Sequence, residues 1–106
     1  MIETKIYVGL NDSETKEQKL STEKYVSVLK KVCRSCGVAF SFSVQQGGYM
    51  HDDGICTQEN TLVLSLIDAD DKITDEIAKD LCAFFNQGSV MITKSSARAY
   101  FVKESL

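Results

Sequence analysis

The clearest pattern of apolar and polar positions covers residues 38–67. Two stretches there have apolar side chains at every second position, and a turn-forming sequence, Asp52-Asp53-Gly54, separates them. The apolar positions are Val38, Phe40, Phe42 and Val44 before the turn, and Leu62, Leu64 and Leu66 after it. Because side chains alternate between the two faces of a strand, this spacing predicts a long β-hairpin.

The length of the turn decides which side chains share a face of this hairpin. A two-residue turn at Asp53-Gly54 would pair Phe42 with Ser65 and separate the phenylalanines from the leucines. A three-residue loop over residues 52–54 pairs Phe42 with Leu64 and gives Gly54 the left-handed conformation that such loops need. We therefore predict the three-residue loop. It puts Met50 and Cys56 on the apolar face, and Tyr49, His51, Ile55 and Thr57 on the other face.

The segment before the hairpin predicts one strand and one helix. Apolar and polar residues alternate over residues 2–10, which indicates a strand. The helix follows Ser21, whose hydroxyl suits an N-cap, and ends at Gly37. Its apolar stripe has helical spacing and consists of Tyr25, Val28, Leu29, Val32, Cys33 and Cys36.

The segment after the hairpin predicts a second helix and two more strands. The helix has Asp70 or Asp71 as its N-cap and is closed by Gln87-Gly88. Its predicted buried face consists of Ile73, Ile77, Ala78, Leu81, Cys82 and Phe85. A strand containing Val90 and Ile92, a turn at residues 94–96 and a short fifth strand at residues 97–102 complete the chain.

This order of elements predicts an α+β fold of the ferredoxin-like type, β-α-β-β-α-β with a terminal strand, formed by residues 1–106 as a single domain. Right-handed connections place both helices on the same face of a mostly antiparallel sheet. The bare face would carry Tyr7, Ser41, Ser43, Val63, Ser65, Ile67 and Met91. Since this face is too apolar for full solvation, we expect the chain to self-associate as a dimer or trimer.

The element order, with its long hairpin between the second and third strands, resembles that of the PII signalling and CutA-like proteins. The resemblance implies the same architecture over most of the chain. The sequence has no nucleotide-binding signature of these families, so no functional residue is carried over.

The net charge of −3 and the pI near 5.1 argue against nucleic acid as a partner. The charge is uneven, because residues 51–80 hold nine acidic and only two basic side chains. No apolar run is long enough to span a membrane, and the first residues do not form a signal peptide. Four cysteines without a secretory signal therefore predict a soluble cytoplasmic protein with reduced thiols.

The cysteines offer one candidate for chemistry. Cys33 and Cys36 form a C-x-x-C pair, but it lies at the C-terminal end of a helix, where the dipole disfavours a thiolate. Both also continue the apolar stripe, so packing in the core is the simpler interpretation. A zinc site would need Cys33, Cys36 and Cys56 with either His51 or Cys82, and this spacing is a weak zinc motif.

Three functions remain open. The first is a non-enzymatic, self-associating module that binds a protein or a small ligand through the bare face and the hairpin tip, residues 45–58. Its candidate contact residues are Tyr7, Gln46, Tyr49, Met50, His51, Val63 and Ile67. The second is a small dimeric α+β-barrel enzyme with a pocket near Tyr7, Tyr49 and His51. The third is a structural zinc or thiol-sensing domain. The first needs no cofactor, metal or catalytic residue.

Overall fold

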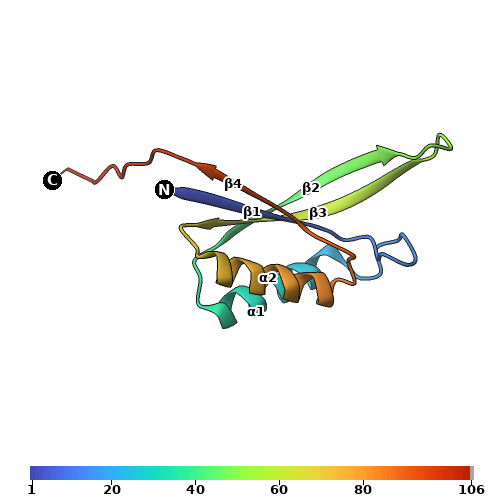
Figure 1. Cartoon of the computed structure of the whole chain (residues 1–106), viewed down its shortest axis with the longest axis horizontal. Coiled ribbons are helices and arrows are strands. Elements are labelled where there is room, and N and C mark those ends of the chain that lie inside the picture. Colours follow the sequence, from blue (N-terminus) through green and yellow to red (C-terminus); the bar gives the residue numbers. More distant parts are fainter. Residues whose placement is uncertain (106) are drawn as a thin grey trace.

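The computed structural model describes residues 1–105. Its elements are β1 (Ile2–Gly9), α1 (Thr22–Cys36), β2 (Ser41–Met50), β3 (Cys56–Ile67), α2 (Asp71–Phe84) and β4 (Met91–Ser96). The strands form one antiparallel sheet in the order β2-β3-β1-β4. This is the predicted ferredoxin-like α+β fold (Figure 1).

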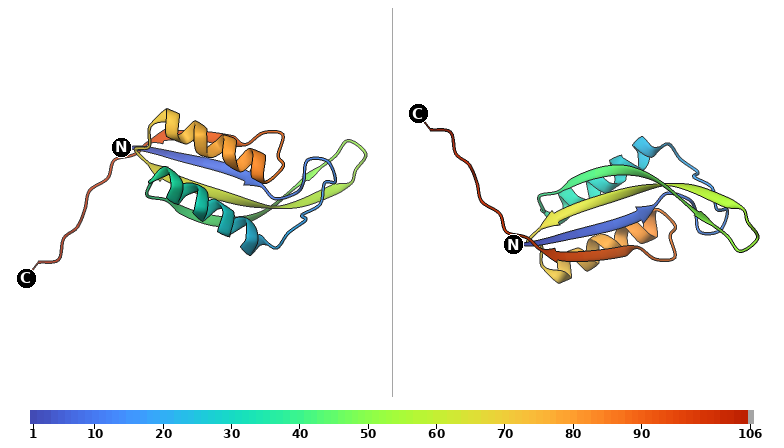
Figure 2. Two further views of the ribbon diagram at one scale, coloured as in Figure 1. Left: turned by 90° about the horizontal axis from the view of Figure 1, so that it is seen from below. Right: turned by 90° about the horizontal axis from the view of Figure 1, so that it is seen from above.

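Both helices cover the same face of the sheet, as predicted (Figures 1 and 2). The core lies between the two layers. It is built from alternate residues of β1 and β3 and from the apolar stripes of the helices, and Ile6, Leu29, Leu64, Ile77 and Leu81 are fully buried there. The helices also contact each other through Tyr25 and Phe85, whose ring centroids are 4.9 Å apart.

The hairpin has the predicted register. Phe42 lies opposite Leu64, and His51 donates its backbone N–H to the carbonyl of Ile55 at 2.9 Å. Gly54 has a φ of +85°, the left-handed conformation expected of a three-residue loop. The hairpin extends beyond the helices, and the molecule measures 59 × 28 × 26 Å (Figure 1).

The predicted helix ends are partly correct. Gly37 has a φ of +68° after α1, and the carboxylate of Asp70 accepts the N–H of Ile73 at 2.8 Å before α2. Ser21 stands at the N-cap of α1, but its side chain makes no capping hydrogen bond. Gly88 does not close α2. The left-handed residue is Asn86, at a φ of +49°, because asparagine also tolerates this conformation.

The prediction for the C-terminal segment is wrong. Residues 94–96 do not form a turn but continue β4, which pairs with β1 as far as Ile2 opposite Ser96. Residues 97–102 form no strand. The reason is that β1 begins at Ile2, so the chain beyond Ser96 has no further residues of β1 to pair with. A smaller difference is that β2 begins at Ser41, although Phe40 still packs against the core.

Candidate functional site

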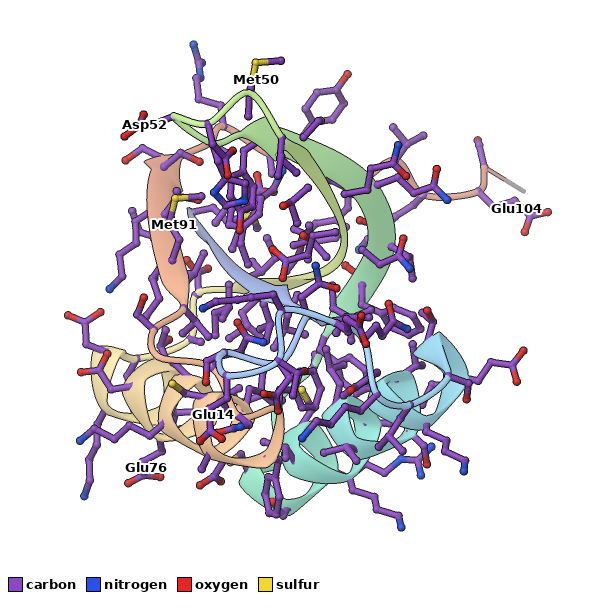
Figure 3. The ribbon with its side chains drawn as sticks, turned by 90° about the vertical axis from the view of Figure 1, so that its right-hand side faces the viewer. Glu14, Met50, Asp52, Glu76, Met91 and Glu104 are labelled. Atoms are coloured by element: carbon purple, nitrogen blue, oxygen red, sulfur yellow. The ribbon has the colours of Figure 1, made fainter. Side chains whose placement is uncertain are left out.

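A polar groove lies where the hairpin leaves the helices. The segment of residues 11–19 runs beside the hairpin here, and the groove between them has a volume of about 700 Å³. Its lining is Asn11, Gln18, Gln46, Gly47, Gly48, Cys56, Gln58, Glu59 and Asn60. Figure 3 looks along the molecule from this end, with Met50 and Asp52 on the hairpin at the top and Glu14 on the 11–19 segment below them. Amide side chains dominate the groove.

Hydrogen bonds hold several of these amides in place. Asn60 Nδ2 donates to Gln18 Oε1 at 2.9 Å, and Gln18 Nε2 donates to Thr22 Oγ1 at 3.0 Å. Asn11 Nδ2 donates to the carbonyl of Gln58 at 3.0 Å. The side chain of Gln46 is exposed. An amide carries both donors and an acceptor, so this lining suits a ligand that presents both kinds of group.

One acidic residue, Glu59, is part of the lining of the groove. Its Oε2 accepts the backbone N–H of Asn11 at 3.0 Å, and the carboxylate lies directly over Gly9. A Cβ atom at Gly9 would be 2.6 Å from the carboxyl carbon of Glu59, so only glycine leaves room for this position. Glu59 also borders a neighbouring cavity of about 290 Å³, together with Asn11, Asp12, Tyr49 and Gln87. Glu59 therefore contributes to the lining of both.

Asp12 fixes the wall of the groove formed by residues 11–19. Its Oδ2 accepts a hydrogen bond from Asn86 Nδ2 at 2.8 Å, and its Oδ1 accepts the backbone N–H groups of Glu14 and Thr15. The Nζ of Lys19 lies 3.4 Å from Oδ2. These groups, with the Asn86 hydrogen bond foremost, hold the pKa of Asp12 well below its usual range. The wall is thus tied to the segment after α2 by an ionised carboxylate.

The residues predicted to contact a ligand or partner fall into two groups. Gln46, Tyr49, Met50 and His51 lie on the hairpin, and Tyr7, Val63 and Ile67 lie on the sheet. Gln46 lines the groove, and Tyr49 borders the smaller cavity. The Tyr49 and His51 rings meet edge to face, with centroids 4.7 Å apart, and His51 Nε2 is 2.6 Å from Thr57 Oγ1. His51 and Met50 are exposed.

The structure does not bring Tyr7, Tyr49 and His51 into one pocket. Tyr7 pairs with Val63, whereas Tyr49 pairs with Thr57, six residues earlier on β3. Six residues of strand span about 20 Å. Within one chain, the pocket expected for a barrel-type enzyme is therefore not formed.

The bare face of the sheet is less uniform than the sequence implied. Val63, which lies between Tyr7 and Ser43 in the sheet, is only 3% exposed, so little of it is accessible to a partner. Ile67 and Met91 are 51% and 57% exposed. Figure 3 shows Met91 with the sheet, away from Glu76 on the helix layer. The accessible apolar surface on this face is carried by Ile67 and Met91.

The cysteines do not converge. Cys33 is fully buried, and burial, with a smaller contribution from Cys36, raises the pKa of its thiol to about 11. Cys82 Sγ donates to the carbonyl of Gln87 at 2.9 Å. His51 bonds to Thr57, while Cys56 lies on the other face of the hairpin beside Gly48. Residues 1–105 contain no cluster of three or more His, Cys, Asp or Glu side chains able to hold a metal ion.

Sequence reasoning missed the most structured part of the groove, Asn11, Gln18, Glu59 and Asn60. Glu59 belongs to the acidic stretch of residues 51–80, and the apolar pattern predicts no helix or strand for residues 11–19. One feature of the sequence could have indicated this site. The polar residues Glu59 and Asn60 break the apolar pattern of β3, and the regular alternation of apolar residues begins directly after them. The contact itself joins residues 48 positions apart, which no local pattern reveals.

Within residues 1–105, no helix is long and apolar enough to cross a membrane. Comparison with protein-family models and with curated proteins found no match. Among solved structures, the chain is similar to a phage SAM lyase in its apo state, with a TM-score of 0.66 and 24% sequence identity over 89% of this chain and 78% of that one.

The same lyase in complex with S-methyl-5'-thioadenosine gives a TM-score of 0.64 at 24% identity, over 89% of this chain and 79% of that one. The periplasmic divalent cation tolerance protein CutA from Archaeoglobus fulgidus gives a TM-score of 0.56 at 10% identity, over 93% of this chain and 87% of that one. At these identities the similarities establish the fold. The chain is a small α+β domain of the ferredoxin-like type.

Proposed function

We propose that this chain is a self-associating α+β module that binds a small nucleoside-type ligand in the groove at the base of the hairpin. The observation that carries the proposal is the placement of Glu59. Its carboxylate accepts the Asn11 N–H, and Glu59 lines both the amide-rich groove and the neighbouring cavity. Polar groups held in place at a concave site are what orient a ligand and make its binding specific.

The amides favour a purine ring as part of the ligand. A glutamine or asparagine side chain can pair with the donor and acceptor of an adenine edge. The Glu59 carboxylate can accept from hydroxyl groups or pair with a cationic group. The similarity to a SAM lyase solved with S-methyl-5'-thioadenosine supports the same ligand class for this chain.

Self-association is supported by the two accessible apolar side chains of the bare sheet face, Ile67 and Met91. We propose a dimer or trimer. We also propose a cytoplasmic location, because the free cysteines suit a reducing compartment.

Isothermal titration of the purified chain with S-methyl-5'-thioadenosine and S-adenosylmethionine tests the ligand. We expect saturable binding, and we expect Glu59→Gln to raise the dissociation constant about tenfold or more, as the loss of a charged hydrogen bond implies. Glu76→Gln, an exposed carboxylate on α2, is the matched control and should bind as the wild type. No binding at about 1 mM nucleoside, or equal binding by Glu59→Gln, would contradict the proposal.

A catalytic role for the same groove is the second candidate. The observation that favours it is the similarity to a SAM lyase along 89% of the chain. If the chain is a lyase of this type, incubation with S-adenosylmethionine should release S-methyl-5'-thioadenosine, detectable by chromatography, and Glu59→Gln should reduce the rate. If S-adenosylmethionine binds but S-methyl-5'-thioadenosine is not released, the chain is a binding protein and not a lyase.

A further inference from the structure

We propose that residues 98–102 of one copy add as an edge strand to β2 of a second copy, with Tyr100 and Val102 entering the apolar groove between β2 and α1. The proposal rests on the self-association proposed above. It adds to the bare sheet face a second contact between the copies, and names the segment and the surface that form it.

The donating segment exposes three large apolar side chains in succession. Tyr100, Phe101 and Val102 are 87%, 85% and 87% exposed, although residues of these types favour strands. The segment leaves the end of β4 and extends away from the body of the protein (Figures 1 and 2). A cluster of this kind usually marks a contact surface.

The receiving strand is an unprotected edge. β2 is the last strand of the sheet, with β3 as its only neighbour, and all ten of its residues are exposed. Edge strands usually carry a lysine, a proline or another charge that prevents pairing. The sequence of β2, SFSVQQGGYM, contains none of these. Its outward N–H and C=O groups can therefore accept a strand from another chain.

An apolar groove accompanies this edge on the helix side. It has a volume of about 370 Å³ and is lined by Thr22, Glu23, Val26, Ser27, Lys30 and Val44. Phe42 and Val44, on the same face of β2, remain 36% and 45% exposed. Lys30 Nζ lies 5.7 Å from the centre of the Phe42 ring. The groove can take side chains of the size of tyrosine and valine.

The alternation of side chains in residues 98–102 and the charges on both surfaces make this segment complementary to the groove. In an added strand, every second side chain points to the same face. Arg98, Tyr100 and Val102 share one such face, so the two apolar side chains can enter the groove together. The side chain of Arg98 then points toward the groove of the second copy, where the lining residue Glu23 has the opposite charge.

The order of strands indicates that the segment of a second copy, and not the chain's own segment, fills the groove. The segment follows β4, while the groove flanks β2 at the opposite edge, about 14 Å away across three strand spacings. The segment also points away from its own sheet (Figure 2). Exchange between two copies, or a ring of more copies, lets each segment reach the free edge of another chain.

The first experiment is light scattering of the full chain and its variants over a range of concentrations. We expect the wild type to be oligomeric, and both Tyr100→Ser/Val102→Ser and Val44→Lys to raise the dissociation constant of the oligomer at least about tenfold. Phe84→Ser is the control, because Phe84 is an exposed aromatic residue on α2 and should not affect assembly.

The second experiment locates the contact. A chain with Tyr100→Cys is mixed with a chain with Val44→Cys under mild oxidation, both carrying Cys56→Ser to remove the exposed native thiol. We expect a disulfide between the two different chains. Replacing Tyr100→Cys by Phe84→Cys should abolish it.

The outcomes are distinguishable. A wild type that stays monomeric overturns both this proposal and the self-association on which it rests. An oligomer that is unchanged by Tyr100→Ser/Val102→Ser and gives no mixed disulfide overturns this proposal alone, and leaves the bare sheet face as the contact. Loss of the oligomer in the Phe84→Ser control also counts against it.

Discussion

At the scale of single residues, the most informative position is Gly9. Its φ is not in the left-handed region, so alanine is compatible with the backbone there. A methyl group would nevertheless meet the Glu59 carboxylate at 2.6 Å. Because that carboxylate is the end of a flexible side chain, it can move away at little cost in folding free energy, but it then loses the Asn11 N–H.

Gly9→Ala should therefore separate binding from stability. We expect its free energy of unfolding to fall by no more than about 0.5 kcal/mol, while nucleoside affinity falls as it does for Glu59→Gln. Urea unfolding and calorimetric titration check the two parts. Gly88→Ala is the control for stability, since no atom lies within 4 Å of a Cβ at Gly88. Unchanged affinity in Gly9→Ala would show that the fixed position of Glu59 is not needed.

Asp12 predicts a specific pH dependence of stability. Its hydrogen bonds lower its pKa in the folded state, so the stability it contributes is present above its unfolded pKa, about 3.9, and is lost as the pH falls toward the folded value. Asp12→Asn should thus be less stable than the wild type at pH 7, and this difference should shrink below about pH 4. Urea unfolding at pH 7 and pH 3 tests it; a constant difference would contradict this role for Asp12.

At the scale of elements, two helix starts that look alike in the sequence differ in the structure. Asp70 caps α2 through the N–H of Ile73, whereas the Ser21 side chain makes no capping bond at α1. Asp70→Ala should lower the free energy of unfolding by about 1 kcal/mol. Ser21→Ala should change it by less than about 0.5 kcal/mol, and thermal unfolding of the two variants measures the contrast. Equal losses would contradict the difference in capping.

The elements also show how far the sequence could predict the fold and the site. The helical stripes and the hairpin register were predictable because burial of one face fixes the side-chain period and excludes a shift by one residue. The end of β4 was not, since the pairing of residues 94–96 depends on where β1 begins. The position of Glu59 over Gly9 was hidden for a similar reason. It depends on two distant strands being neighbours in the sheet.

At the scale of the whole molecule, the bare sheet face makes a prediction about assembly. Ile67→Lys places a charge at a position that is half exposed in one chain, so the fold should persist while the oligomer weakens. Light scattering measures the mass, and circular dichroism checks the fold. Val63→Lys is a useful contrast, because Val63 is 3% exposed and the charge should instead destabilise the single chain. An Ile67→Lys oligomer as stable as the wild type would exclude this face as a contact.

The order β2-β3-β1-β4 also has a consequence for folding. The hairpin of β2 and β3 joins neighbouring segments and can form early, since closing a short loop costs little entropy. β1 precedes the other strands in the chain but lies between β3 and β4, and its pairing with β4 joins residues far apart in the sequence, such as Ile2 and Ser96. The sheet is therefore complete only after Ser96 has left the ribosome. Until then one side of β1 stays unpaired, and unpaired strand edges are where folding chains tend to aggregate.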